Sequence, residues 1–99
     1  PDVKYSGGPD EMIELDKFFS KHNIEFSPHN PSGPIAHAHS IQICSVSTPC
    51  LLEYQYKESD KFDSIINLSN TPIINSKVRT ITSEKGLGVS INMENLLKK

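Results

Sequence analysis

The 99-residue sequence has no tryptophan, only two cysteines and no long uninterrupted apolar run. A membrane-spanning helix needs about 20 consecutive apolar residues, so we expect no membrane partner. Basic and acidic residues nearly balance, at 10 and 12, which argues against a nucleic-acid surface. Cys44 and Cys50 are too few for a disulfide framework and do not form a Cys-x-x-Cys pair, so we expect small buried thiols, reduced in a cytoplasmic protein.

The small size of the chain limits the core that it can build alone. A domain of this length buries only about 60 to 65 per cent of its unfolded surface. The first residues, Pro1-Asp2, read as the last residues of a strand. We therefore expect the chain to be a piece of a longer protein.

Helix and strand signals alternate along the first half of the chain. Proline and acidic residues at positions 9–11 predict a helix start, and apolar residues recur at helical spacing as far as Phe19. Asn23 can end this helix in the left-handed conformation. The short β-prone segment 24–27 that follows predicts a strand, which the Pro28-His29 turn ends.

The same alternation repeats after the turn. Gly33-Pro34 suits the first turn of a helix, and the pattern from Pro34 to Val46 is apolar around much of the circumference, as for a helix packed on a sheet. Residues 50–52 then predict a second buried strand that ends at Glu53. The order strand, helix, strand, helix, strand predicts an α/β fold with a parallel sheet.

The pattern changes beyond Tyr56, where the charged segment 57–63 begins. Three short extended segments with polar breaks predict a meander, at residues 65–68, 71–74 and 77–82. Asn92 is suited to cap a last short helix over residues 93–98. We therefore expect two parts, residues 1–56 and residues 57–99.

Asp2 and His29 each end a predicted strand, one helix and one strand apart, so they belong at the same edge of a parallel sheet. An aspartate bonded to one imidazole nitrogen fixes the tautomer and raises the basicity of the other, which makes a proton-abstracting base. The alternative is a structural histidine. Glu53 ends the next strand, and the residues alone leave it either a solvated rim residue or a group that contacts substrate.

His37 and His39 form a His-x-His pair, which is a possible metal site. On the predicted helix, residues two apart point in nearly opposite directions and do not grip one ion together. If this segment were a strand, the pair would share a face and a metal-dependent hydrolase would become an alternative.

Four segments in this order resemble a known family. They are Pro1-Asp2-Val3-Lys4-Tyr5-Ser6-Gly7-Gly8, Pro28-His29-Asn30-Pro31-Ser32-Gly33-Pro34-Ile35-Ala36, Leu52-Glu53-Tyr54 and Lys85-Gly86-Leu87-Gly88-Val89. Together they resemble the C-terminal part of the enolase superfamily, more narrowly the mandelate racemase subgroup and its acid-sugar dehydratases of the galactonate dehydratase kind.

The resemblance implies a fold and a set of site residues. Residues 1–56 would be the C-terminal part of a (β/α)₇β TIM-like barrel, from the end of strand 6 to strand 8, and residues 57–99 would return to the α+β capping domain. His29 and Asp2 would form the catalytic dyad, and Glu53 would hydrogen-bond the substrate carboxylate and the enediolate formed from it. Mg²⁺ would be the cofactor, with its ligands outside this chain.

The implied activity is that of a hydro-lyase acting on a small sugar acid. It would remove the α-proton and then water to give a 2-keto-3-deoxy acid, in a parent protein that we expect to be a homo-oligomer. The 99-residue chain alone is expected to be inactive. Two alternatives remain open, a racemase or epimerase of a hydroxy acid and a non-catalytic truncated fragment that only associates.

Overall fold

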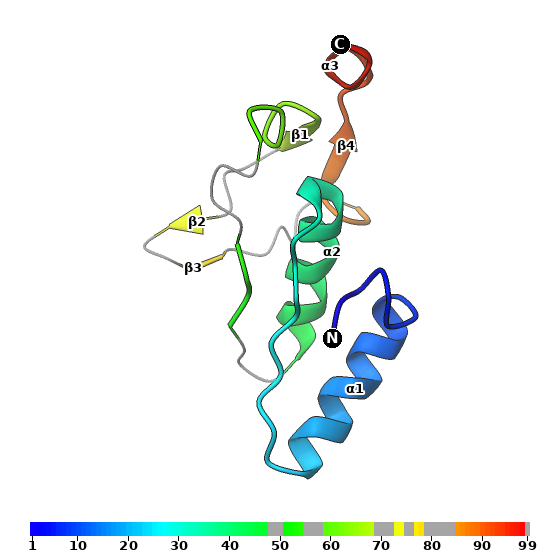
Figure 1. Cartoon of the computed structure of the whole chain (residues 1–99), viewed down its shortest axis with the longest axis vertical. Coiled ribbons are helices and arrows are strands. Elements are labelled where there is room, and N and C mark those ends of the chain that lie inside the picture. Colours follow the sequence, from blue (N-terminus) through cyan, green and yellow to red (C-terminus); the bar gives the residue numbers. More distant parts are fainter. Residues whose placement is uncertain (48–50, 55–58, 69–72, 75–76, 79–84, 99) are drawn as a thin grey trace.

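The computed structural model describes residues 1–47, 51–54, 59–68, 73–74, 77–78 and 85–98. Its elements in chain order are α1 (Pro9–Lys21), α2 (Gly33–Val46), β1 (Ile66–Leu68), β2 (Ile73–Ile74), β3 (Lys77–Val78), β4 (Val89–Ile91) and α3 (Met93–Leu97) (Figure 1). Within these described ranges, no helix combines the length and the apolar character needed to cross a bilayer.

Helix α1 has the boundaries that the sequence predicts. It begins at Pro9 and carries acidic residues in its first turn, where carboxylates favour the positive end of the helix dipole. At its end the N–H of Ile24 donates to the carbonyl of Phe19, and the N–H of Asn23 donates to the carbonyl of Ser20. Asn23 has a φ of 57°, so the helix ends in a Schellman motif with asparagine in the left-handed position.

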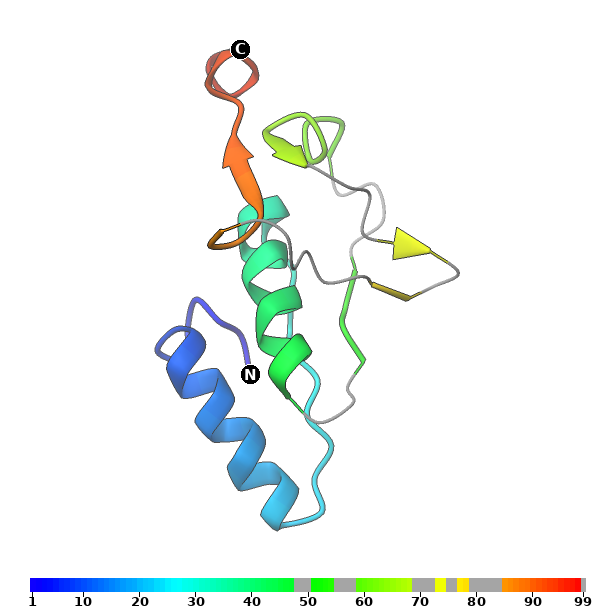
Figure 2. The same cartoon turned by 180° about the vertical axis from the view of Figure 1, so that it is seen from behind.

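Helix α2 is also confirmed, and it lies beside α1 (Figures 1 and 2). Residues on several sides of it are buried, as expected for a helix covered by more than one neighbour: Pro34, Ala36, His37, Ala38, Ser40, Ile41 and Ile43. The buried apolar cluster joins both helices to the segments between them. Its members are Val3, Met12, Phe26, Ala36 and Ile43, with Ile13 and Phe19 packed against it.

The predicted strands at 24–27 and 50–52 are not regular strands where the structure describes them: residues 24–30 and 51–54 are extended but unpaired in any ladder. The segments are adjacent, because His29 N–H donates to the carbonyl of Pro1 at 2.7 Å and Ser27 Oγ donates to that of Leu51 at 2.9 Å. A parallel ladder needs evenly spaced backbone bonds, and these isolated bonds do not make one. The predicted order of neighbours is therefore right, although the regular pairing is absent.

The meander predicted after residue 64 is present in part. β2 and β3 form an antiparallel hairpin, and β1 pairs antiparallel with β4, with Ile66 opposite Ile91. β4 was not predicted, because three residues are too few to show strand periodicity. Helix α3 is capped as predicted, since Asn92 Oδ1 accepts from the Asn95 N–H at 3.1 Å. The predicted extended residues 71–72 and 79–82, and residues 75–76 within the meander, lie outside the described residues.

The predicted boundary between the two parts of the chain stays a prediction. It falls at residue 56, and residues 55–58 lie outside the described ranges.

The left-handed position at the end of α1 gives a stability prediction. Asn23→Ala should lower the free energy of unfolding by about 1 kcal/mol, because alanine lacks the short polar side chain whose local hydrogen bonds let asparagine tolerate a positive φ. Asn23→Gly, which has no β-carbon, is the matched control and should be neutral or slightly stabilising. Urea unfolding of the protein carrying each change measures both values, and equal stability of the two variants would contradict the role given to Asn23.

Candidate active site

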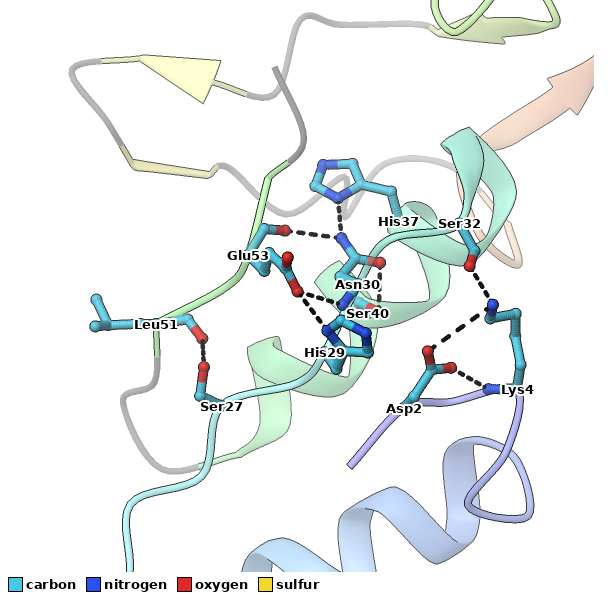
Figure 3. A network of polar contacts seen from close by, with 10 residues as sticks. All are labelled: Asp2, Lys4, Ser27, His29, Asn30, Ser32, His37, Ser40, Leu51 and Glu53. Carbon is cyan, nitrogen blue, oxygen red and sulfur yellow. Dashed lines mark hydrogen bonds and ion pairs between the residues drawn. The ribbon is translucent and has the colours of Figure 1, made fainter. Parts of the chain in front are cut away.

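His29 and Glu53 meet at the end of the extended segment that leads into α2. The Nδ1 of His29 lies 2.8 Å from Oε2 of Glu53, as Figure 3 shows. The pKa of Glu53 is held below its ordinary value mainly by the backbone N–H of Asn30 and then by the bond to His29. An ionised carboxylate only accepts hydrogen bonds, so Nδ1 carries the imidazole proton in the neutral ring. That leaves Nε2 unprotonated and basic.

The imidazole is placed at the surface rather than in the core. The His29 side chain is 61% exposed and that of Glu53 is 38% exposed. No described residue forms a hydrogen bond with Nε2. A half-exposed imidazole with one nitrogen bonded to a carboxylate and the other open to solvent has the form of a general base near neutral pH.

Asn30 lies directly beneath this pair and is 5% exposed. Its backbone N–H donates to Oε2 of Glu53 at 2.9 Å, and its side-chain Nδ2 donates to the Glu53 carbonyl, also at 2.9 Å. Nδ2 also contacts Nδ1 of His37 at 2.6 Å, and Oδ1 accepts from Ser40 Oγ at 3.2 Å. One amide therefore joins Glu53 to two side chains of α2 (Figure 3).

These bonds fix the protonation of His37. The Glu53 carbonyl can only accept, so the amide atom facing it is the NH₂ group, and this group also faces Nδ1 of His37. Nδ1 of His37 is therefore an acceptor and the proton is on Nε2. His37 is 6% exposed, and burial lowers its pKa below the ordinary value of 6.5. Its ring packs against Tyr54 and Phe62, with centroids 5.3 Å and 6.2 Å away.

Asp2 is adjacent to His29 but is not bonded to it in the described part of the chain. The carboxylate instead closes its own turn, since Oδ1 accepts from the Lys4 N–H at 2.8 Å and Oδ2 lies 3.9 Å from Lys4 Nζ. Asparagine and aspartate often make this two-residue bond. The predicted contact between Asp2 and the imidazole is thus replaced by the contact between His29 and Glu53. The catalytic roles of the three residues remain predictions.

Lys4 extends this edge of the site towards α2. Its Nζ donates to Ser32 Oγ, and it lies 4.6 Å from the ring centroid of Tyr5. The loop that contains Lys4 is therefore hydrogen-bonded to Ser32, the residue that precedes α2.

The residues that the structure describes do not form a magnesium site. Across the described ranges there is no group of three or more His, Cys, Asp or Glu side chains able to hold a metal ion. The alternative metal site at His37 and His39 is wrong, because Gly33–Val46 is helical and Nδ1 of His37 is bonded to Asn30.

Sequence reasoning missed the buried partners of the predicted site, Asn30, His37 and Ser40. His37 and Ser40 are three residues apart and therefore share one face of α2. Two polar residues on one face of an otherwise apolar helix were an available signal for a buried network. Asn30 gave no such signal, because asparagine is a common turn residue between prolines.

Residues 1–95 match the family described as enolase C-terminal domain-like. The chain is 31% identical over 105 aligned positions to the D-galactonate dehydratase of Xanthomonas campestris pv. campestris (strain B100), covering all of this chain and 27% of that protein. It is 28% identical to the D-galactonate dehydratase of Verminephrobacter eiseniae (strain EF01-2), with the same coverage. The chain thus spans about a quarter of the length of these relatives.

The fold is similar to a crystal structure of a mandelate racemase/muconate lactonizing enzyme-like protein from Rubrobacter xylanophilus DSM 9941. The TM-score is 0.83 at 25% sequence identity, over 95% of this chain and 24% of that one. The enolase C-terminal domain is the TIM-barrel part of such proteins, so the predicted α/β fold class is confirmed.

The bond between His29 and Glu53 predicts the tautomer of the imidazole. In the neutral ring the proton should be on Nδ1, and Glu53→Ala should remove this preference by removing the acceptor. Two-bond ¹H–¹⁵N correlation spectra of the ¹⁵N-histidine-labelled protein distinguish the two tautomers. His37 is the internal control, and its proton should stay on Nε2 in both proteins. A neutral His29 protonated on Nε2 in the unchanged protein would contradict the assignment.

The buried imidazole of His37 predicts a pH dependence of stability. Because its folded pKa is lowered, its stabilising contribution is complete above the unfolded pKa of about 6.5 and is lost as the pH falls towards the folded value. The free energy of unfolding should therefore fall as the pH is lowered through the unfolded value of about 6.5. His37→Asn, whose Oδ1 supplies an acceptor in place of Nδ1, should show a smaller fall. The same slope in both proteins would assign the effect to other groups.

Proposed function

This chain belongs to the enolase C-terminal domain-like family, and from that membership we propose that it is the catalytic C-terminal portion of an acid-sugar dehydratase. The substrate would be a small sugar acid of the galactonate type, because the curated relatives at 28 to 31% identity are D-galactonate dehydratases. The reaction is removal of the α-proton followed by loss of water, which gives a 2-keto-3-deoxy acid. The observation that carries the proposal is the half-exposed His29 imidazole with Nδ1 on Glu53.

His29 is the proposed base. Nε2 takes the α-proton, and the imidazolium that forms is stabilised by the Glu53 carboxylate on the opposite nitrogen. The lowered pKa of Glu53 keeps this carboxylate ionised at neutral pH. For Glu53 to donate a hydrogen bond to a substrate carboxylate it would need a proton, so in this arrangement its proposed role is to orient His29.

Asp2 is proposed as the second charged group at this edge. It is buried and adjacent to His29 through the Pro1 carbonyl, and its negative charge acts on Glu53. A second carboxylate at this edge would help to stabilise the positive charge that the imidazole gains when it removes the α-proton. We expect Asp2→Asn to reduce the rate of proton removal by less than the loss of His29 does.

Members of the enolase superfamily generally use Mg²⁺, and the proposal includes this ion for the parent protein. It would stabilise the enediolate as a Lewis acid. Its ligands are expected in the N-terminal part of the parent protein, outside this chain.

The chain alone is proposed to be inactive and to act within a larger, homo-oligomeric protein. Large apolar side chains are exposed on it, including Tyr5 at 83%, Leu51 at 81% and Leu97 at 74%. Exposed apolar surface of this kind is normally covered by another domain or subunit. The same surface supports the alternative that the chain only associates with other copies.

Racemisation of a hydroxy acid is the other enzymatic candidate. The structural neighbour is described as mandelate racemase/muconate lactonizing enzyme-like. In either reaction, one base on one face of the substrate can remove the α-proton. A screen of the full-length protein with Mg²⁺ against acid sugars separates the two. Formation of a 2-keto-3-deoxy acid supports dehydration, whereas inversion at the α-carbon without loss of water supports racemisation.

The role of His29 gives a direct kinetic prediction for the full-length enzyme. His29→Asn removes the basic nitrogen and should lower the rate of α-proton exchange with deuterated solvent by about 10²- to 10⁴-fold. His22→Asn is the matched control, since His22 is an exposed histidine at the end of α1, and should leave the rate nearly unchanged. Exchange at the unchanged rate in His29→Asn would show that His29 is not the base.

A further inference from the structure

His37 lies between a hydrogen-bond donor on one side and aromatic rings on the other. Its Nδ1 is 2.6 Å from Nδ2 of Asn30, the donor end of that amide, as Figure 3 shows. Its Nε2 is buried and has no hydrogen-bond partner among the described residues. A protonated imidazole carries an N–H on both nitrogens and needs two acceptors. The surroundings of His37 therefore suit only the neutral ring.

Two aromatic rings cover His37 and keep water from supplying the missing acceptors. The ring centroid of Tyr54 lies 5.3 Å away and that of Phe62 lies 6.2 Å away. Tyr54 and Phe62 also meet each other edge to face, with centroids 6.2 Å apart. His37 is consequently only 6% exposed, so a charge on its ring would be poorly solvated.

The titratable groups on the elements around His37 offer it no acceptor in the ranges that the structure describes. These groups are Glu53 and Tyr54 in segment 51–54, Asp60, Lys61 and Asp63 around Phe62, and His39 on α2. Oε2 of Glu53 accepts from His29 and from the Asn30 backbone, and the three groups around Phe62 are exposed. Residue 39 is two positions along the helix and points in a nearly opposite direction. Burial is therefore the cause of the lowered pKa of His37.

Protonation of His37 would break the bond between the Asn30 side chain and the Glu53 carbonyl. A charged ring presents an N–H at Nδ1, so the amide has to turn its oxygen towards the ring. The same turn points Oδ1 at the Glu53 carbonyl, which accepts from Nδ2 at 2.9 Å while the ring is neutral. Two acceptors then face each other and repel. Ser40 can follow the turn, since its hydroxyl both donates and accepts.

Loss of this bond would matter because segment 51–54 has little other regular support. It forms no strand ladder in the part of the chain that the structure describes. The bond from the Asn30 side chain joins the backbone of residue 53 to an amide that is itself bonded to α2 through His37 and Ser40. The protonation state of one ring on α2 thus decides whether residue 53 is held to this helix.

We propose that His37 is a pH-sensitive switch: the neutral ring lets the Asn30 side chain hold the backbone of residue 53 to α2, and the protonated ring releases it. Release would displace the segment that carries Glu53 and lower the activity at acidic pH, a consequence that rests on the function proposed above. The switch itself is a property of this chain and is measured without a substrate.

The first test follows the Glu53 carbonyl during a pH titration. In the ¹³C,¹⁵N-labelled protein that contains this chain, spectra that correlate the Tyr54 N–H with the Glu53 carbonyl carbon report on the bond. The carbon should shift upfield as its hydrogen bond is lost, with the same midpoint as the ring nitrogens of His37. The unchanged protein decides the matter without any variant. A carbonyl shift that passes through the His37 midpoint unaltered overturns the proposal, and so does global unfolding before His37 takes a proton.

Two variants assign the step to His37 rather than to the nearby His29 and Glu53 side chains. His37→Asn cannot titrate, and the step at the Glu53 carbonyl should be absent from it. His39→Asn is the matched control, because it removes a histidine two residues away on the same helix, and the step should remain. A step that persists in a folded His37→Asn protein would assign it to another group and overturn the proposal.

The second test is the pH dependence of dehydration by the full-length enzyme. Below the His37 midpoint, log(kcat/KM) should fall more steeply in the unchanged enzyme than in His37→Asn, by about one unit per pH unit, because a second proton removes activity. His39→Asn should keep the steeper slope. Equal slopes in the unchanged enzyme and in His37→Asn would show that the switch does not act on the reaction.

The two tests separate failure of the inference from failure of the proposed function. A protein that processes no acid sugar but shows the carbonyl step at the His37 midpoint retains the switch and refutes the function. A protein that dehydrates an acid sugar without this step refutes the switch alone.

Discussion

The site depends on one constraint, the need to satisfy the buried amide of Asn30. A buried polar group without partners costs about 1–3 kcal/mol, so the amide must find donors and acceptors among its neighbours. It finds the Glu53 carbonyl, Nδ1 of His37 and the Ser40 hydroxyl. Because these come from two different segments, satisfying one side chain fixes residue 53 against α2. The bond between His29 and Glu53 then follows from the position of residue 53.

Sequence reasoning succeeded where the signal is local. The start of α1 at Pro9, its left-handed end at Asn23, the whole of α2 and the Asn92 cap are set by residues within one helical turn of each other. It failed at the predicted strands 24–27 and 50–52, as far as the structure describes them, because regular strand pairing depends on neighbours that no local pattern contains. The adjacency of Pro1 and His29 was nevertheless correct, since the order of elements constrains which segments meet.

In the candidate site, too, the sequence predicts which residues take part but not which contacts they make. The sequence predicted Asp2, His29 and Glu53 as site residues from their places at segment ends, and their catalytic roles remain predictions. It could not predict which carboxylate bonds the imidazole, because that depends on the turn at Asp2. There the Lys4 N–H occupies Oδ1 at 2.8 Å, while Glu53 is brought to Nδ1 of His29 by contacts with Asn30. The choice between the two carboxylates therefore depends on the hydrogen bond that each of them accepts from a backbone N–H, that of Lys4 for Asp2 and that of Asn30 for Glu53.

The two histidines near Asn30 show how different neighbours set opposite tautomers of two neutral imidazoles. His29 lies above Asn30 and bonds an ionised carboxylate, so its neutral ring is protonated on Nδ1. His37 lies in the core and accepts from the amide, so its ring is protonated on Nε2 and stays neutral. A carboxylate only accepts and an amide nitrogen only donates. His29 faces the carboxylate, and His37 faces the amide nitrogen. The His29 imidazole can therefore accept a proton from solvent or substrate, whereas the His37 imidazole must stay neutral if the hydrogen-bond network is to persist.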